Sequence, residues 1–211
     1  MARPSDLLRA SVPLRHLVHR WRQLRWVLGG RRGPPPARVK QALVRSCGRT
    51  YHLRVLIETG TYMGDMVYAA RRDFDAIYSI ELSQELHAYA RERLARFPHV
   101  HLLRGDSGKL LGEVLSQVQV PCLFWLDSHY SGGSTAKAGV ETPILRELEA
   151  IASHSVRGHV ILIDDARDFD GRDDYPDLDT LGALSARLFP GSTMDVDTDV
   201  IRIVCAPGQG P

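Results

Sequence analysis

Three aspartates stand directly after two of the most apolar segments of this 211-residue chain. Asp127 follows the segment CLFWL, and Asp164 and Asp165 follow HVILI. If both segments are neighbouring strands of one sheet, the carboxylates meet at one edge, where like charges cost stability unless a cation joins them. Carboxylate oxygens suit a hard divalent ion, with Mg²⁺ first and Mn²⁺ or Ca²⁺ as alternatives. The sequence therefore predicts a metal site formed by these three aspartates.

A histidine lies two residues beyond the first aspartate. His129 is close enough to Asp127 to act on a substrate bound at the predicted ion. An imidazole with an ordinary pKa near ~6.5 suits proton removal at neutral pH. We therefore predict that His129 is the general base, beside Asp127. A loop histidine bonded to the backbone is the alternative.

Two glycines lie in a turn that follows the first apolar segment. In Glu58-Thr59-Gly60-Thr61-Tyr62-Met63-Gly64 they let the backbone turn sharply and approach a ligand ahead of a helix. Their spacing is GxxxG, which differs from the GxGxxG of dinucleotide sites. Any tight strand-to-helix turn would use a glycine, but the place after the first strand favours a cofactor loop.

Polar residues also end the next two apolar segments. Glu81 suits a ribose, because one carboxylate can accept hydrogen bonds from two vicinal hydroxyls; the alternative is a solvated residue before a helix. Asp106 and Ser107 could hold an exocyclic amine, or Asp106 could cap the following helix.

The segments that must position these residues alternate between two patterns. Runs rich in branched or aromatic residues predict strands at 53–57, 76–80, 100–103, 122–126 and 159–163. Helical periodicity marks residues 37–46, 64–72, 84–97, 109–118, 143–154 and 178–188. Strands separated by helices imply right-handed crossovers and a parallel sheet, whereas 193–196 and 200–205 are close enough only for an antiparallel hairpin. The prediction is a doubly wound α/β domain with a mostly parallel, seven-stranded sheet.

Composition narrows the class of protein. Hydrophobic residues make up 44% and charged residues 25%, as in globular proteins. The three cysteines are far apart and form no CxxC pair, which argues against a disulfide scaffold or zinc ribbon and predicts a cytoplasmic protein. No apolar run approaches the ~20 residues of a membrane span.

The first forty residues carry a large net positive charge. They hold ten bases and one acid, whereas the remainder holds 17 bases and 24 acids. A basic arm on an acidic body is not typical of a nucleic-acid-binding domain, so no nucleic acid partner is expected.

Apolar residues recur at helical steps from residue 11 to 28, and RRGPPP follows at 31–36. We therefore divide the chain into a basic amphipathic helix with its linker, 1–36, and a domain, 37–211. Three interpretations of the arm remain open: a contact with an anionic membrane surface, a targeting presequence, or a helix packed on its own domain or a second copy of the chain.

The motifs ETGTYMG, Glu81, GDS, LDSH and IDD, in this order, resemble the strand-end motifs of S-adenosylmethionine-dependent methyltransferases with the Rossmann-like fold. Within that superfamily the chain resembles metal-dependent O-methyltransferases of the macrocin type, which act on sugar hydroxyls. It is more distantly similar to catechol O-methyltransferases. The resemblance covers roughly residues 53–206.

The resemblance implies a role for each motif. S-adenosylmethionine would lie against Glu58, Thr59, Gly60, Tyr62, Gly64 and Asp127, with its ribose on Glu81 and its adenine by Asp106 and Ser107. Asp127, Asp164 and Asp165 would bind the metal, and His129 would take the place of the base. His129 stands where macrocin-type enzymes usually carry a second acid. The expected loop at 128–142 is long and contains Gly132, Gly133 and Lys137, so acceptor recognition does not transfer.

Three functions follow as alternatives. The first is metal-dependent methyl transfer from S-adenosylmethionine to a hydroxyl of a small acceptor, a sugar or glycoside. The second is metal-independent methyl transfer, with the Asp164-Asp165 pair holding a loop. The third is a cofactor-binding protein without catalysis, whose arm recruits a partner or a membrane. A nicotinamide-dependent oxidoreductase is disfavoured by the missing GxG.

Overall fold

The computed structural model of the chain describes residues 26, 28, 33–127, 142–172 and 174–207. Its strands are β1 (Val55–Thr59), β2 (Ala76–Glu81), β3 (Val100–Arg104), β4 (Cys122–Leu126), β5 (Val160–Ile163), β6 (Thr193–Asp197) and β7 (Val200–Val204). Its helices are α3 (Ala37–Thr50), α4 (Asp65–Ala70), α5 (Gln84–Leu94), α6 (Ser107–Leu115), α7 (Ile144–Ser153) and α8 (Leu178–Leu188), with a short 3₁₀ turn, η1 (Ala166–Asp168).

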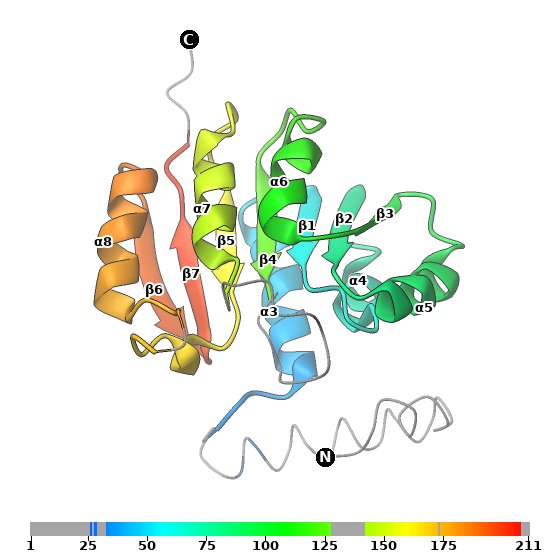
Figure 1. Cartoon of the computed structure of the whole chain (residues 1–211), viewed down its shortest axis with the longest axis horizontal. Coiled ribbons are helices and arrows are strands. Elements are labelled where there is room, and N and C mark those ends of the chain that lie inside the picture. The colour runs from blue at the N-terminus through cyan, green and yellow to red at the C-terminus, as the bar shows by residue number, and fades with distance from the viewer. Residues whose placement is uncertain (1–25, 27, 29–32, 128–141, 173, 208–211) are drawn as a thin grey trace.

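The seven strands form one sheet in the order β3-β2-β1-β4-β5-β7-β6 (Figure 1). All neighbouring pairs from β3 to β5 are parallel, and β7 runs antiparallel to both β5 and β6. The predicted fold class is therefore confirmed, including the closing hairpin. Because the strand order reverses direction between β1 and β4, a crevice is expected at their carboxyl ends.

Helices cover both faces of the sheet and bury one apolar core on each. On one face α3, α4 and α5 contribute Val44, Val67 and Leu94 to a core with Trp125 of β4. On the other face α6, α7 and α8 pack against the alternate strand residues, such as Phe124. The two neighbours on β4 point to opposite faces, as the pleat of a strand requires, so both faces of the central strands are buried.

Two element bounds differ from the sequence prediction in a way that matters for the site. Glu58 and Thr59, expected in the loop, are the last two residues of β1 and pair with Ser79 and Ile80 of β2. An acidic residue resembles loop sequence, but here a hydrogen bond from Ser79 satisfies it inside the sheet. Helix α6 begins at Ser107, two residues before the predicted start, because the Asp106 carboxylate accepts the Gly108 N–H at 3.0 Å and caps the helix.

No helix in the described part of the chain is both long and apolar enough to cross a bilayer. The predicted basic helix at 11–28 falls almost wholly outside the described residues, so its interpretations stay predictions. Helix α3, in contrast, is part of the folded body: Val44 and Cys47 are buried in the core.

Candidate active site at the carboxyl edge of the sheet

The sequence-predicted residues gather at the carboxyl edge of the central strands. Backbone pairing continues past the strand ends there: the Asp127 N–H donates to the carbonyl of Thr59, and the Asp164 N–H donates to that of Leu126, both at 3.0 Å. These bonds hold the residues that follow β1, β4 and β5 side by side. The edge therefore brings the glycine turn and the aspartates to the β1/β4 crevice.

The glycine turn after β1 has the conformation its sequence predicts. Gly60 and Gly64 have φ of 85° and 72°, in the left-handed region that favours glycine. Gly64 is the N-cap residue of α4, and a Cβ there would lie 2.9 Å from Cδ1 of Leu94. Tyr62 also has a positive φ, 50°, and its side chain is exposed. The turn presents backbone rather than large side chains at the start of α4.

Glu81 is anchored at the end of β2 by two backbone donors. Its Oε2 accepts the Tyr62 N–H at 2.7 Å, and its Oε1 accepts the Ser83 N–H at 2.9 Å. A carboxylate has about four lone-pair positions, so each oxygen retains acceptor capacity. The carboxylate is thus fixed in orientation and tied to the glycine turn, as a predicted ribose acceptor requires.

Glu58 and Thr59 lie inside the sheet at the end of β1, and Glu58 is linked to the turn by hydrogen bonds. Glu58 is 1% exposed and accepts a hydrogen bond from the Ser79 hydroxyl, whose oxygen lies 2.5 Å from that of Thr61. Burial raises the pKa of Glu58 well above its usual range, and the bond from Ser79 opposes the rise. Thr59 is fully buried. Contact of either residue with a cofactor stays a prediction, whereas the structure links Glu58 to the turn through the hydroxyls of Ser79 and Thr61.

Asp106 takes the role of helix cap that the sequence left open. Besides the Gly108 N–H, its carboxylate faces Arg146 at 3.6 Å and Lys109 at 3.7 Å. Ser107 is buried in the first turn of α6. Capping does not use all the acceptor capacity of Asp106, so a contact with adenine stays a prediction.

The three aspartates form one cluster. Asp127, Asp164 and Asp165 each offer an oxygen within 4.8 Å of the others, and the last two are buried. Such a set of hard oxygen donors fits a divalent cation. The aspartates predicted from the sequence to share a cation do come together in the structure.

A lysine that the sequence analysis did not select supplies a positive charge to this cluster. The ammonium of Lys40, in α3, lies 2.6 Å from a carboxylate oxygen of Asp164 and 2.8 Å from one of Asp165. It was counted with the basic arm, although it belongs to the folded body. A signal was present: the chain uses arginine 24 times and lysine three times, and Lys40 is the only lysine before the first strand.

Asp165 is also held by its backbone and by an arginine. It has φ of 53°, unusual for a residue other than glycine, and its N–H donates to Asp164 at 2.7 Å. Arg167 lies 3.0 Å from its carboxylate and pairs with Asp199. Burial raises the pKa of Asp164 to about 6, the charge of Asp165 adds to the rise and the Lys40 ammonium opposes it.

His129 lies outside the described residues, as does the rest of 128–141. Its role as general base stays a prediction. Helix α7 begins shortly after this segment, with its first backbone donor, Ile144 N–H, held by the Thr142 hydroxyl at 3.3 Å.

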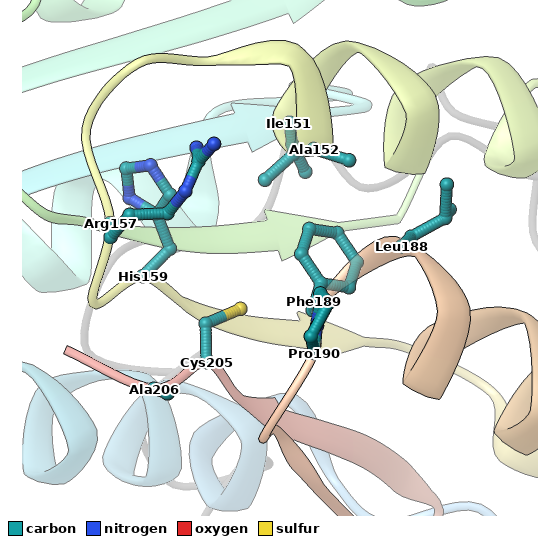
Figure 2. Close-up of a pocket in the computed structure, with 9 residues that line it drawn as sticks. All are labelled: Ile151, Ala152, Arg157, His159, Leu188, Phe189, Pro190, Cys205 and Ala206. Atoms are coloured by element: carbon teal, nitrogen blue, oxygen red, sulfur yellow. The ribbon is translucent and has the colours of Figure 1, made fainter. Parts of the chain in front are cut away.

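A hollow of about 300 Å³ lies at the other end of the sheet (Figure 2). It is lined by Ile151, Ala152, Arg157, His159, Leu188, Phe189, Pro190, Cys205 and Ala206. His159 precedes β5 and Cys205 follows β7, whereas Asp164 stands at the opposite end of β5. This hollow is therefore separate from the carboxyl-edge site.

The wall of the hollow includes one member of a buried histidine pair. The Cys122 N–H donates to Nδ1 of His159 at 3.0 Å, so the proton of that neutral ring is on Nε2, which faces Nδ1 of His154 at 3.0 Å. Nε2 of His154 in turn donates to the carbonyl of Val118 at 3.0 Å. Burial lowers the pKa of His159 to about 4. The pair is a structural bridge between β4, β5 and α7.

Neither a protein-family model nor a curated protein sequence matches this chain. Solved structures do. An O-methyltransferase from Bacillus cereus, in complex with SAH, aligns with a TM-score of 0.59 at 15% identity over 80% of this chain and 81% of its own. The SAH-bound Podospora anserina methyltransferase PaMTH1 gives 0.57 at 19% identity over 86% of each chain.

The O-methyltransferase TomG from Streptomyces achromogenes, in complex with SAM and involved in tomaymycin synthesis, gives a TM-score of 0.53 at 18% identity over 80% of each chain. At these identities the likeness concerns the fold. The chain thus has the Rossmann-like fold of these methyltransferases, and its acidic cluster lies at the carboxyl edge of the sheet.

Proposed function

We propose that this protein is an S-adenosylmethionine-dependent O-methyltransferase that acts on a hydroxyl of a small acceptor, a sugar or glycoside. The observation that carries the proposal is the Glu81 carboxylate, held by two backbone donors beside the glycine turn at the carboxyl edge of this fold. These two donors leave acceptor capacity on both oxygens of the buried, oriented carboxylate, which the diol of a ribose could use.

Each residue of the edge has a task in this proposal. The turn from Gly60 to Gly64 lies against the methionine part of the cofactor, and Glu81 accepts hydrogen bonds from the ribose. Asp106 and Ser107 border the adenine. The cofactor supplies the methyl group, bound to a sulfonium. The chain's contribution is to hold that group in line with the acceptor oxygen, which in ideal cases is worth on the order of 7–11 kcal/mol.

Asp127, Asp164 and Asp165 are proposed to hold a divalent cation, Mg²⁺ first. The fit rests on their oxygen donors and on Lys40, whose ammonium shows that a positive charge fits between the two buried aspartates. A divalent ion here would lower the pKa of an acceptor hydroxyl and orient it. His129 is the proposed group that takes the hydroxyl proton.

Lys40 also favours a second candidate, metal-independent methyl transfer. In that case the lysine itself balances Asp164 and Asp165, and the pair serves to hold the loop after β5. The acceptor and the cofactor contacts are the same in both cases. The two candidates therefore differ in what neutralises the cluster and in whether a metal ion helps to activate the acceptor hydroxyl.

The test is transfer of a labelled methyl group to a panel of sugars and glycosides, with Mg²⁺ or with EDTA. We expect transfer to hydroxyl groups that EDTA suppresses, and a fall of about 10²–10⁴-fold in turnover for His129→Ala, the usual worth of a general base. Full activity in EDTA would contradict the metal dependence and support metal-independent methyl transfer. No transfer, together with no binding of S-adenosylhomocysteine, would refute the methyltransferase.

A further inference from the structure

Lys40 is placed where a divalent cation would bind. Its side chain is 14% exposed and spans from the first turns of α3 to the buried aspartates after β5. Its ammonium contacts oxygens of both Asp164 and Asp165, at 2.6 and 2.8 Å. In sequence these groups are more than 120 residues apart. The contact is therefore a tertiary one, made by the fold and not by local chain geometry.

An ammonium and a metal ion would compete for these oxygens. Mg²⁺ binds carboxylate oxygens at about 2.0–2.1 Å, so an ion bound to both aspartates would stand within the space that the ammonium fills. The repulsion between unit charges about 4 Å apart is several kcal/mol in a partly buried setting. Binding of a metal ion therefore favours the departure of the ammonium.

Lysine is suited to leave. Its charge sits on a flexible four-carbon stem, so the ammonium can withdraw to water while the α3 backbone stays in place. Helix α3 is fixed independently by Val44 and Cys47 in the core and by ion pairs from Arg45 and Arg49 to Asp73. The exchange therefore needs only the side chain to move.

We propose that Lys40 is a built-in competitor for the divalent cation: it neutralises Asp164 and Asp165 while the site holds no metal and is displaced into water when a metal binds. The inference rests on the cation site proposed above. Its consequence is that Lys40 lowers the affinity of the protein for metal. Without metal, the aspartates stay paired with Lys40. The site then binds metal only at a concentration high enough to displace the ammonium.

The first test measures metal affinity. We compare how tightly Mn²⁺ binds to the full chain in wild type, Lys40→Met and Lys109→Met. Free Mn²⁺ is measured by its electron paramagnetic resonance signal. Lys109→Met is the matched control, since it removes the same charge from an exposed lysine. We expect Lys40→Met to bind Mn²⁺ about ten- to a hundredfold more tightly than wild type, and Lys109→Met to bind as wild type does.

The second test uses the wild type alone, in case Lys40→Met fails to fold because buried Asp164 loses its ammonium partner and Asp165 keeps only Arg167. Lysines are acetylated briefly with and without Mg²⁺ and quantified by mass spectrometry. Acetylation of Lys40 should be slow without metal and rise several-fold with it. Lys109, which is exposed in either case, is the internal reference.

The outcomes separate this inference from the proposed function. Two results would refute the competition but not the metal site. One is equal Mn²⁺ affinity in wild type and Lys40→Met; the other is an acetylation rate of Lys40 that saturating metal does not change. Binding by Lys40→Met but not by wild type would support the competition and favour metal-independent catalysis. If neither protein binds metal while both bind S-adenosylhomocysteine, the competition is refuted and the methyltransferase is untouched.

Discussion

Glu81 has both a structural and a proposed ligand-binding role, and one substitution can separate them. Glu81→Gln keeps one acceptor oxygen for the backbone but loses the charge and one acceptor. Hydrogen bonds to a charged group are worth about 1.5–3 kcal/mol, so we expect S-adenosylhomocysteine to bind roughly ten- to a hundredfold more weakly. Calorimetry measures this, with Glu92→Gln on the exposed side of α5 as the control. Unchanged affinity in a folded variant would remove Glu81 from the cofactor site.

The types of residue at the strand ends were enough to predict where the polar groups gather. They were not enough to predict which partner each group has. Asp127, Asp164 and Asp165 could be grouped from the sequence because each follows a strongly apolar strand. Lys40 could not, because its contact with Asp164 joins segments that only the finished fold brings together. The role of Asp106 as a cap was one of two alternatives, and hydrogen-bond geometry decides for it without excluding a ligand contact.

At the scale of elements, periodicity located the strands and helices more reliably than their ends. Strand β4 and helix α8 begin and end where apolar patterning places them. The end of β1 was misplaced because Glu58 is polar, although pairing with β2 and β4 keeps it in the sheet. Ends depend on caps and on partners in other segments, which a single strand's sequence does not contain.

The turn between β1 and α4 should tolerate no side chain at Gly64. Gly64→Ala places a Cβ in the left-handed region and 2.9 Å from Leu94, so we expect a loss of about 1–3 kcal/mol in unfolding free energy, with weaker cofactor binding. Gly112→Ala is the control: this helical glycine has open space, and alanine should stabilise α6 by about 0.5–1 kcal/mol. Urea unfolding measures both; a neutral Gly64→Ala would contradict the described turn.

The buried pair of His154 and His159, which bridges β4, β5 and α7, should make the free energy of unfolding depend on pH. His159 has a pKa of about 4 in the fold against 6.5 unfolded, so the unfolded chain binds more protons between these values. Its contribution is fully present above pH 6.5 and is lost as pH falls towards 4, by about 3 kcal/mol at most. Urea unfolding from pH 7 to 4 measures this loss, which should be smaller in His159→Gln than in wild type. An equal loss in both would assign the dependence to other groups.

At the scale of the whole molecule, the folded body should not need the segment before α3. Deletion of residues 1–33 leaves α3 and Lys40 in place, and we expect a cooperatively folded domain by thermal unfolding. Deletion of residues 1–50 removes Val44 and Cys47 from the core and should abolish that transition. An unfolded product from the shorter deletion would make the arm part of the core.

The basic arm is proposed to contact an anionic membrane surface. A larger fraction of the intact chain than of the chain without residues 1–33 should therefore sediment with vesicles of anionic lipid. The difference should disappear at high salt, because the attraction is electrostatic. Equal retention of both at low salt would refute this proposal and leave self-association of the arm as the next interpretation to test.

The most direct test of the central claim is a calorimetric titration of the full chain with S-adenosylhomocysteine, in Mg²⁺ and in EDTA. We expect one binding site per chain under both conditions, since the glycine turn, Glu81 and Asp106 do not depend on the metal. The absence of binding to a folded chain in both buffers would contradict it.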